Sequence, residues 1–348
     1  MTKALFVIDT PMQVANLLEA ISVFDIAHYD IITCDVSKAD GYAQLQRQLQ
    51  RLSPGRLINV PRVEGDIAAR VKAYAQHLPW LKAQNYKKVF FSNIRQHWQR
   101  DIVCSLDNPS PILMDDGNSA VMLYELRFKK GIFFDFPEDP DIKRLEVANE
   151  VRDLFGVSTR QPDHLTLFTI FKLETLPWLD IVANPMALMR CEHADINSEQ
   201  VLIMGTGAVA LNYISLAHYI ELLRKIASHY EGRKCIYQPH RITSKAVLND
   251  IQKATGFEVI RLDCPVENWL HEHSCPPGTL VSFFSAALST CSLCFPKIDV
   301  VSATPDISAW ESARQAHVFH MPGTDNLQII EILLQYLRGD KAIETLRL

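Results

Sequence analysis

The chain has 348 residues, of which 48% are hydrophobic and 22% are charged. This length suggests two domains or one large α/β domain, and the apolar content excludes wholesale disorder because it can supply a sizeable core. The 35 Lys and Arg residues against 40 Asp and Glu residues give a net charge of −5. We therefore do not expect the whole protein to capture nucleic acid or anionic lipid electrostatically.

The first apolar run, residues 4–8, meets Asp9 after five residues and is too short for a signal-peptide core. No uninterrupted apolar run approaches the roughly 18 residues of a membrane-spanning helix. The eight cysteines have no regular spacing, and the Cys291-x-x-Cys294 pair has no second ligand pair near it. We therefore expect a cytoplasmic protein with reduced thiols, and core thiols rather than a zinc site at that pair.

Short apolar runs alternate with amphipathic stretches in the first third of the chain. We predict strands at residues 3–9, 29–35, 57–60, 88–93 and 112–116. The predicted helices cover residues 11–24, 41–52 and 65–78, and one more begins near residue 95. Strands that are apolar on both faces and alternate with helices indicate a parallel sheet covered on both sides.

Residues 125–195 break this rhythm, with an acidic turn-rich loop at 135–141, a charged helix at 142–154 and an apolar stretch at 165–173. The rhythm then restarts, with predicted strands at 201–204, 234–238, 257–262, 279–283, 299–302 and 317–320. Further helices are predicted at 212–229, 244–254 and 325–337. This pattern predicts two Rossmann-like domains facing a cleft, residues 1–197 with an irregular insertion at about 125–195, and residues 198–348.

Ligands in such sheets bind beyond the carboxyl ends of the strands, so the residues after each predicted strand are candidates for a site. The predicted strand at 112–116 ends in Asp115 and Asp116, and Gly117 and Asn118 follow it. A glycine can take a positive φ, and a carboxylate held on such a turn could act as a general base. The alternative is an Asp that only caps the next helix.

A second candidate is the segment Gly205-Thr206-Gly207, which continues to Ala210 and spells GxGxxA after a strand. Taken alone, it resembles a dinucleotide fingerprint. Its helix starts late, however, and no acid ends a strand about 20 residues further on. We expect a phosphate or nucleotide site here, and an NAD(P)-dependent oxidoreductase remains an alternative.

Three further positions follow predicted strands or open helices. His240 with Arg241 suits a phosphate or another leaving anion, although a turn histidine is the alternative. Glu267 either complements a helix dipole or accepts hydrogen bonds from ribose hydroxyls. Ser282 and Ser285 either offer donors to a phosphate or serve as ordinary helix caps.

The order of these motifs along the chain resembles bacterial sialyltransferases with the two-domain GT-B fold. The lipooligosaccharide sialyltransferase family, glycosyltransferase family fifty-two, is most similar, and family eighty and the capsule polysialyltransferases are more distant. These enzymes share an acidic-acidic-Gly motif, a His-Pro motif and a Ser motif, and the segment 9–13 also resembles their opening. The chain departs from that pattern in having Pro239 before His240 and Ala286 after Ser285.

The resemblance implies an inverting, metal-independent transfer of sialic acid from CMP-sialic acid to a hydroxyl of an acceptor glycan, such as a terminal galactoside of a lipooligosaccharide or capsule. Asp116 would be the general base, and His240 would protonate or hydrogen-bond the leaving phosphate. The residues implied to bind CMP are Gly205, Thr206, Gly207, Arg241, Glu267, Ser282 and Ser285. Those implied to support the acceptor side and its turn are Thr10, Gln13, Asp115, Gly117 and Asn118.

No cofactor, metal or nucleic acid is implied, and the enzyme would work in the cytoplasm with peripheral association at the inner membrane. The spelling Asp139-Pro-Asp141 matches a metal-binding Asp-x-Asp, but it falls in the turn-rich loop. The alternatives are a GT-B enzyme for another nucleotide sugar, the NAD(P)-dependent oxidoreductase, and a catalytically inactive carbohydrate- or nucleotide-binding protein of the same fold.

Overall fold

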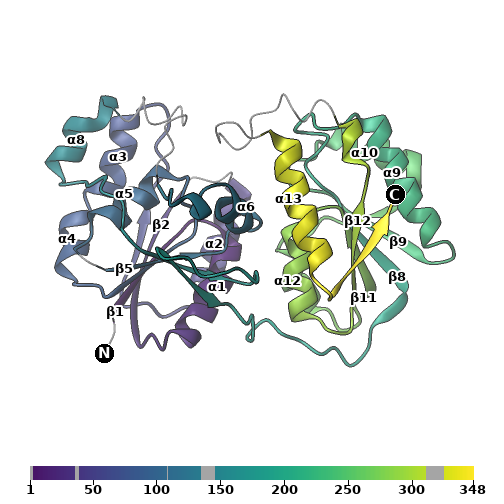
Figure 1. Ribbon diagram of the computed structural model, residues 1–348, viewed down its shortest axis with the longest axis horizontal. Coiled ribbons are helices and arrows are strands. Elements are labelled where there is room, and N and C mark those ends of the chain that lie inside the picture. The colour runs from purple at the N-terminus through teal and green to yellow at the C-terminus, as the bar shows by residue number, and fades with distance from the viewer. Residues whose placement is uncertain (1–2, 36–38, 108, 135–145, 311–324) are drawn as a thin grey trace. The chain divides into compact units, whose positions relative to one another are not determined.

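A computed structural model describes residues 3–35, 39–107, 109–134, 146–310 and 325–348, and the chain forms two compact units, Met1–Leu188 and Met189–Leu348 (Figure 1). The sequence placed the boundary after residue 197 instead. The segment before that point belongs to the second unit because its backbone bonds there. The Cys191 N–H donates to the Cys294 carbonyl (2.9 Å), and Lys297 Nζ donates to the His193 carbonyl (2.7 Å).

The described part of the first unit contains a seven-stranded parallel sheet in the order β3-β2-β1-β4-β5-β6-β7. Its strands are β1 (Lys3–Ile8), β2 (His28–Cys34), β3 (Leu57–Val60), β4 (Lys88–Phe91), β5 (Ser110–Met114), β6 (Leu165–Thr169) and β7 (Leu179–Ala183). Its helices are α1 (Pro11–Val23), α2 (Ala39–Leu49), α3 (Ile67–Ala75), α4 (Leu78–Ala83), α5 (His97–Ser105), α6 (Ser119–Leu126) and α8 (Asn149–Leu154), with 3₁₀ turns η1 (Phe128–Lys130) and η2 (Glu146–Ala148).

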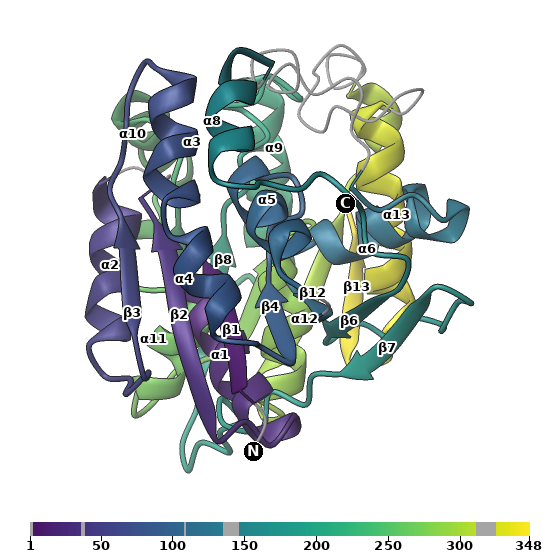
Figure 2. The same ribbon diagram turned by 90° about the vertical axis from the view of Figure 1, so that its left-hand side faces the viewer.

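The central strands of this sheet are buried on both faces because helices cover both sides. Figure 2 shows α3, α4 and α5 on one face of the sheet, and α1 lies on the other. Residues 4–8 of β1 are fully buried, and the rings of Phe6 and Phe90 stack with centroids 4.5 Å apart. Continuous apolar strands of this kind are typical of a parallel sheet between two helix layers.

The predicted irregular insertion at 125–195 is wrong in part, because it contributes two strands to the sheet. Strand β6 pairs with β5 in parallel, from Ile112↔Thr166 to Met114↔Phe168, and β7 pairs with β6. The edge strand β7 is mostly unburied, so its sequence lacks the continuous apolar run that identified the inner strands. Where a charged helix was predicted, the described residues form the 3₁₀ turn η2 and the short helix α8. The acidic loop 135–141 lies outside the described residues.

The described part of the second unit contains a six-stranded parallel sheet in the order β10-β9-β8-β11-β12-β13. Its strands are β8 (Asn197–Met204), β9 (Lys234–Gln238), β10 (Glu258–Val259), β11 (Pro277–Ser282), β12 (Asp299–Thr304) and β13 (Ile343–Arg347). Its helices are α9 (Leu216–His229), α10 (Lys245–Thr255), α11 (Val266–Glu272), α12 (Ala286–Cys294) and α13 (Asn326–Gly339), with a 3₁₀ turn η3 (Ile307–Ala309).

In the second unit, α9 and α10 cover one face of the sheet and α12 and α13 cover the other (Figure 1). Helix α9 begins at Leu216, later than the predicted residue 212, because the Ser215 hydroxyl accepts a hydrogen bond from the His218 N–H (3.2 Å) and caps it there. Strand β13 was not predicted, and the predicted strand 317–320 lies outside the described residues.

Both sheets follow the same path: three strands run outward to one edge, and the chain then crosses back to the other side of the first strand. The strand order therefore reverses between β1 and β4 in the first sheet and between β8 and β11 in the second. Such switch points are where open α/β sheets bind ligands, beyond the carboxyl ends of the strands. Each unit is thus Rossmann-like, as predicted.

The eight cysteines are free thiols, and Cys275 is exposed whereas Cys34, Cys291 and Cys294 are buried. Among the described residues, no group of three or more His, Cys, Asp or Glu side chains is arranged to hold a metal ion. Cys291 and Cys294 are both fully buried, and burial raises the pKa of the Cys291 thiol well above its usual value. Within the same described residues, no helix is both long and apolar enough to cross a membrane.

Candidate functional site

Three acidic side chains lie at the carboxyl ends of β1 and β5 in the first unit. Asp9 follows β1, and Asp115 and Asp116 follow β5. Asp9 and Asp115 are 1% and 5% exposed, whereas Asp116 is half-buried. Gly117 turns the chain with φ of 63°, in the left-handed region that favours glycine. The sequence therefore placed the acidic pair correctly at the rim of the sheet.

Asp115 joins this turn to two neighbouring elements. Its Oδ2 accepts a hydrogen bond from the Ile170 N–H (2.7 Å), directly after β6, and its backbone carbonyl accepts one from Asn16 Nδ2 (2.8 Å) on α1. Burial raises the pKa of Asp115 to about 7. Asp115 therefore holds the turn in place while Asp116 occupies its more exposed side. Asn118, also named by the sequence, is half-buried at the start of α6.

Two glutamines connect the acids across the switch point. Gln13 Oε1 accepts hydrogen bonds from the Asp9 N–H (2.7 Å) and the Thr10 N–H (3.3 Å), and its Nε2 donates to Asp116 Oδ1 (3.3 Å). Gln99 Nε2 donates to Asp9 Oδ2 (3.1 Å). Burial and then the charge of Asp116 raise the pKa of Asp9 to about 7.

Asp9 and Gln99 were not among the predicted site residues. The position of Asp9 at the end of the first strand was a usable signal, since the same rule identified the acids after β5. Gln99 lies within α5, and a single glutamine inside a helix has no spacing that marks it.

In the second unit, the loop after β8 packs directly on the end of β9. A Cβ added to Gly205 would lie 2.3 Å from Tyr237 Oη and 3.2 Å from the His240 backbone nitrogen. A Cβ added to Gly207 would lie 3.5 Å from Nδ1 and Cε1 of the His240 ring. The two glycines therefore allow a close approach that brings this loop and His240 together.

His240 is held in a neutral form by its surroundings. Burial and then the charge of Arg241 lower the pKa of its imidazole. Its Nδ1 accepts a hydrogen bond from the Ile242 N–H (3.4 Å), which assigns the ring proton to Nε2. Nε2–H is therefore a hydrogen-bond donor, and the exposed Arg241 adds a permanent positive charge beside it.

The other predicted donor-side residues have different environments. Glu267 is 6% exposed in the first turn of α11, and burial raises its pKa. Ser285 caps α12 by accepting a hydrogen bond from the Ala287 N–H (3.3 Å). The prediction that Ser282 contacts phosphate is wrong, because its fully buried hydroxyl donates to the Met204 carbonyl (2.9 Å) and joins β11 to β8.

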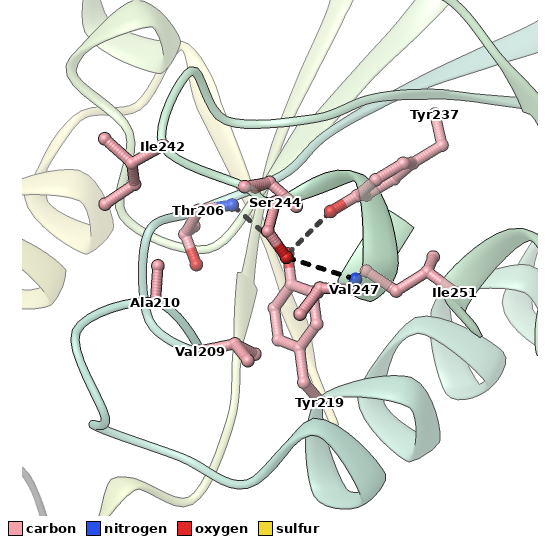
Figure 3. Close-up of a pocket in the computed structure, with 10 residues that line it drawn as sticks. Thr206, Val209, Ala210, Tyr219, Tyr237, Ile242, Ser244, Val247 and Ile251 are labelled. Carbon is pink, nitrogen blue, oxygen red and sulfur yellow. Dashed lines mark hydrogen bonds between the residues drawn. The ribbon is translucent and has the colours of Figure 1, made fainter. Parts of the chain in front are cut away.

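A cavity of about 130 Å³ lies beside this loop, between α9 and α10 (Figure 3). Tyr219 and Tyr237 belong to its lining; their hydroxyl oxygens are 3.3 Å apart, and Tyr219 Oη accepts a hydrogen bond from the Thr206 N–H (3.1 Å). The remaining lining residues are Thr206, Val209, Ala210, Ile242, Thr243, Ser244, Val247 and Ile251. The two tyrosines therefore support the Gly-Thr-Gly loop from within the unit, a role that their core-like sequence context did not reveal.

The dinucleotide fingerprint does not have its usual geometry here. In that motif the glycines open a helix whose N-terminus meets the pyrophosphate. Residues 208–215 instead form turns before α9 begins at Leu216. The loop can approach a phosphate through its backbone, but the helix does not start at the glycines.

No protein-family model and no curated protein matches the chain. Several solved structures share its fold. A UDP-N-acetylglucosamine 2-epimerase is 12% identical with a TM-score of 0.51, covering 98% of this chain and 89% of that one. A putative UDP-N-acetylglucosamine 2-epimerase from Listeria monocytogenes is 11% identical (TM-score 0.50; 98% and 89% covered). A UDP-glucosyltransferase from Polygonum tinctorium is 10% identical (TM-score 0.50; 99% and 84% covered).

Identities this low establish a shared fold only. The similarity extends over both units, and each unit has its own parallel sheet with helices on both faces. The chain therefore has the two-domain, Rossmann-like GT-B fold of glycosyltransferases.

Proposed function

We propose that the protein is a sialyltransferase, which moves sialic acid from CMP-sialic acid to a hydroxyl of an acceptor glycan. The observation that carries the proposal is the packing of the Gly-Thr-Gly loop against the neutral His240 at the end of β9. The fold and the order of the motifs along the chain support it.

On the donor side, the leaving group is a phosphate monoester that gains negative charge as the glycosidic bond breaks. His240 Nε2–H donates a hydrogen bond to that phosphate, and Arg241 supplies a fixed positive charge. The backbone N–H groups at the start of α12, with Ser285, complete the phosphate contacts. Glu267 accepts hydrogen bonds from the ribose hydroxyls. The lowered pKa of His240 favours hydrogen-bond donation over complete proton transfer.

On the acceptor side, Asp116 takes the proton from the attacking sugar hydroxyl in a single inverting displacement. It is the most exposed acid of the three at this rim, and Asp115 holds its turn. Asp9 and Asp115 are less suited to the role because both are buried. No metal is needed in this scheme, since protein donors neutralise a single phosphate.

We further propose that the acceptor is a terminal galactoside of a lipooligosaccharide or capsule, and that the enzyme works in the cytoplasm at the inner membrane. CMP-activated sugars are made in the cytoplasm of the bacteria whose sialyltransferases the chain resembles. The acceptor assignment rests on the same resemblance.

A second candidate is a glycosyltransferase that uses a UDP-sugar. It is favoured by the names of the similar structures, which include UDP-N-acetylglucosamine 2-epimerases and a UDP-glucosyltransferase. The choice between CMP-sialic acid and a UDP-sugar depends on which nucleobase the second unit binds and on how many phosphates it accepts.

Calorimetry with CMP, UDP and NAD tests these alternatives on the intact protein. We expect CMP to bind and the Arg241→Ala variant to bind it more weakly. Transfer from CMP-sialic acid to lactose, as a model galactoside, then tests the reaction. Binding of UDP without CMP would favour the second candidate, and binding of NAD alone would favour an oxidoreductase. CMP binding without transfer to any galactoside would favour an inactive binding protein.

A further inference from the structure

The two buried glutamines of the first unit, Gln13 and Gln99, have amide orientations that the backbone determines. Gln13 Oε1 accepts hydrogen bonds from two consecutive N–H groups, those of Asp9 and Thr10. Gln99 Oε1 likewise accepts from the N–H groups of Ser92 (3.0 Å) and Asn93 (2.9 Å), which follow β4. Only an oxygen can occupy these positions, so the Nε2 of each side chain must point the other way.

The two side chains differ in the carboxyl groups they reach: both glutamines hydrogen-bond Asp9, and Gln13 also reaches Asp116. Gln13 Nε2 donates to Asp116 Oδ1 (3.3 Å), and Gln99 Nε2 donates to Asp9 Oδ2 (3.1 Å). Both glutamines are fully buried. Asp9 is buried too, so water cannot simply replace a donor lost there, whereas at the half-buried Asp116 the hydrogen bond from Gln13 favours the charged form beside any solvent contact.

The acids at this rim compete for ionisation. Asp9 and Asp116 repel each other, and neighbouring carboxylates do not both ionise easily. The other titratable groups near them are Asp115, on the same turn as Asp116, and Cys34, at the end of β2. Burial and the charge of Asp9 raise the pKa of Cys34 to about 12, so this thiol stays neutral. Burial favours the neutral form of Asp9 and of Asp115, and Asp116 is the least buried of the acids.

We propose that Gln13 is a positioning residue, which orients the Asp116 carboxyl and favours its ionised form by donating a hydrogen bond to it. The proposal rests on the proposed function, in which Asp116 is the general base. Gln13 acts through Asp116 and contacts neither donor nor acceptor. Its donated hydrogen bond favours the charged form of the base.

Gln13→Glu tests this with little change of shape, because a carboxyl oxygen can still accept the two backbone hydrogen bonds. The variant replaces the Nε2 donor with an acidic oxygen beside Asp116. We expect the acidic limb of the pH profile of kcat to move to higher pH by at least about one unit. The KM for CMP-sialic acid should stay unchanged.

Gln99→Glu is the matched control, since it has the same pair of backbone acceptors and the same change in charge but faces Asp9. We expect it to move the acidic limb less, because the added charge further favours the protonated form of Asp9. Equal movement in the two variants would overturn the proposal, since it would reflect added charge alone.

Asp9→Asn separates the two acids. The proposal predicts that this variant still transfers and that its acidic limb stays in place or moves to lower pH, because a repelling neighbour is gone. Loss of transfer in Asp9→Asn, with transfer kept in Asp116→Asn, would overturn it by making Asp9 the base.

Carboxyl ¹³C NMR titration of the wild-type protein and Gln13→Glu gives a readout that needs no substrate, with Asp116→Asn and Asp9→Asn used for assignment. We expect the Asp116 resonance to titrate at a lower pH than that of Asp9, and Gln13→Glu to raise the Asp116 midpoint. The reverse order would overturn the proposal. Absence of sialyl transfer by wild-type protein would instead count against the proposed function and leave the titration result interpretable.

Discussion

Gly205 approaches Tyr237 so closely that a Cβ on the glycine would lie 2.3 Å from the tyrosine hydroxyl oxygen. Tyr237 is fully buried, and its hydroxyl lies 3.3 Å from that of Tyr219, which in turn bonds the Thr206 N–H. The path of the loop after β8 thus depends on two aromatic side chains from neighbouring elements. A side chain at residue 205 would have to displace either the loop or the tyrosine.

Gly205→Ala should therefore destabilise the second unit by about 1–3 kcal/mol and weaken CMP binding at least tenfold. Gly207→Ala is the matched control, because its Cβ would meet the flexible end of Ile242 at 3.0 Å and the His240 ring at an ordinary 3.5 Å. Thermal unfolding and calorimetry with CMP measure both effects. Wild-type affinity in Gly205→Ala would show that the loop does not depend on this approach.

Asp116→Asn should lower kcat by about 10²–10⁴, the usual loss when a general base is removed, and leave CMP affinity and stability nearly unchanged. Asp115→Ala should instead lower stability, because it removes the buried oxygen that accepts a hydrogen bond from the Ile170 N–H. Steady-state kinetics and urea unfolding of the two variants measure this contrast. Near wild-type transfer by Asp116→Asn would contradict its assignment as the base.

His240→Ala should lower kcat more than it weakens CMP binding, because its hydrogen bond strengthens as the phosphate gains charge. Arg241→Ala should mainly raise the KM for the donor, since a fixed cation stabilises the ground state and the transition state alike. Kinetics with a CMP-sugar measure the two constants for each variant. An effect of His240→Ala on KM alone would leave the leaving-group role unassigned.

Ser282→Ala and Ser285→Ala should have different effects. Ser282→Ala removes the buried hydrogen bond to the Met204 carbonyl, so we expect a loss of about 1–3 kcal/mol in the free energy of unfolding and an unchanged donor KM. Ser285→Ala should raise the donor KM and cost about 0.5–2 kcal/mol through the lost cap of α12. A raised donor KM in Ser282→Ala, with an unchanged free energy of unfolding, would instead support the prediction that Ser282 contacts the phosphate.

The contribution of Asp9 and Asp115 to stability should fall as pH rises from about 4 to about 7. The pKa values of Asp9 and Asp115 are raised from the ordinary 3.8 to about 7 in the folded protein, mainly by burial. In that window the unfolded chain binds fewer protons than the folded one, so deprotonation favours unfolding, and the effect levels off above about 7. Asp9→Asn removes one of the two contributions. Its free energy of unfolding, measured in urea across this window, should depend less steeply on pH than that of the wild type.

The sequence predicted strands that have an apolar, buried centre. The predicted bounds of β3 (Leu57–Val60) and β9 (Lys234–Gln238) match the structure, because each is a short apolar run between turn residues. The edge strands β7 and β13 were missed, since β13 reads Ile-Glu-Thr-Leu-Arg and exposes most of its residues. In β7 and β13, backbone pairing with a neighbour stabilises a strand that carries polar residues, and that pairing has no signature in the local sequence.

The sequence could predict those site residues whose position depends only on where a strand ends. The acids before Gly117 and the imidazole after β9 follow strands directly, so the topology alone places them at the rim of each sheet. Ser282 was misassigned because the last residue of a buried strand can face either the core or the ligand. The roles of Gln13 and Gln99 depend on which amide atom meets the backbone, and this is known only from the folded arrangement.

The distribution of thiols makes the protein chemically addressable without mutation. Cys275, in the loop between α11 and β11, is the one exposed cysteine of the eight, and the others are half-buried or buried. A maleimide fluorophore or spin label should therefore attach first at this residue, in the unit where we place the nucleotide. Cys275 precedes β11, at the amino ends of the parallel strands, whereas the proposed nucleotide site lies at their carboxyl ends, so a label there would leave that site free.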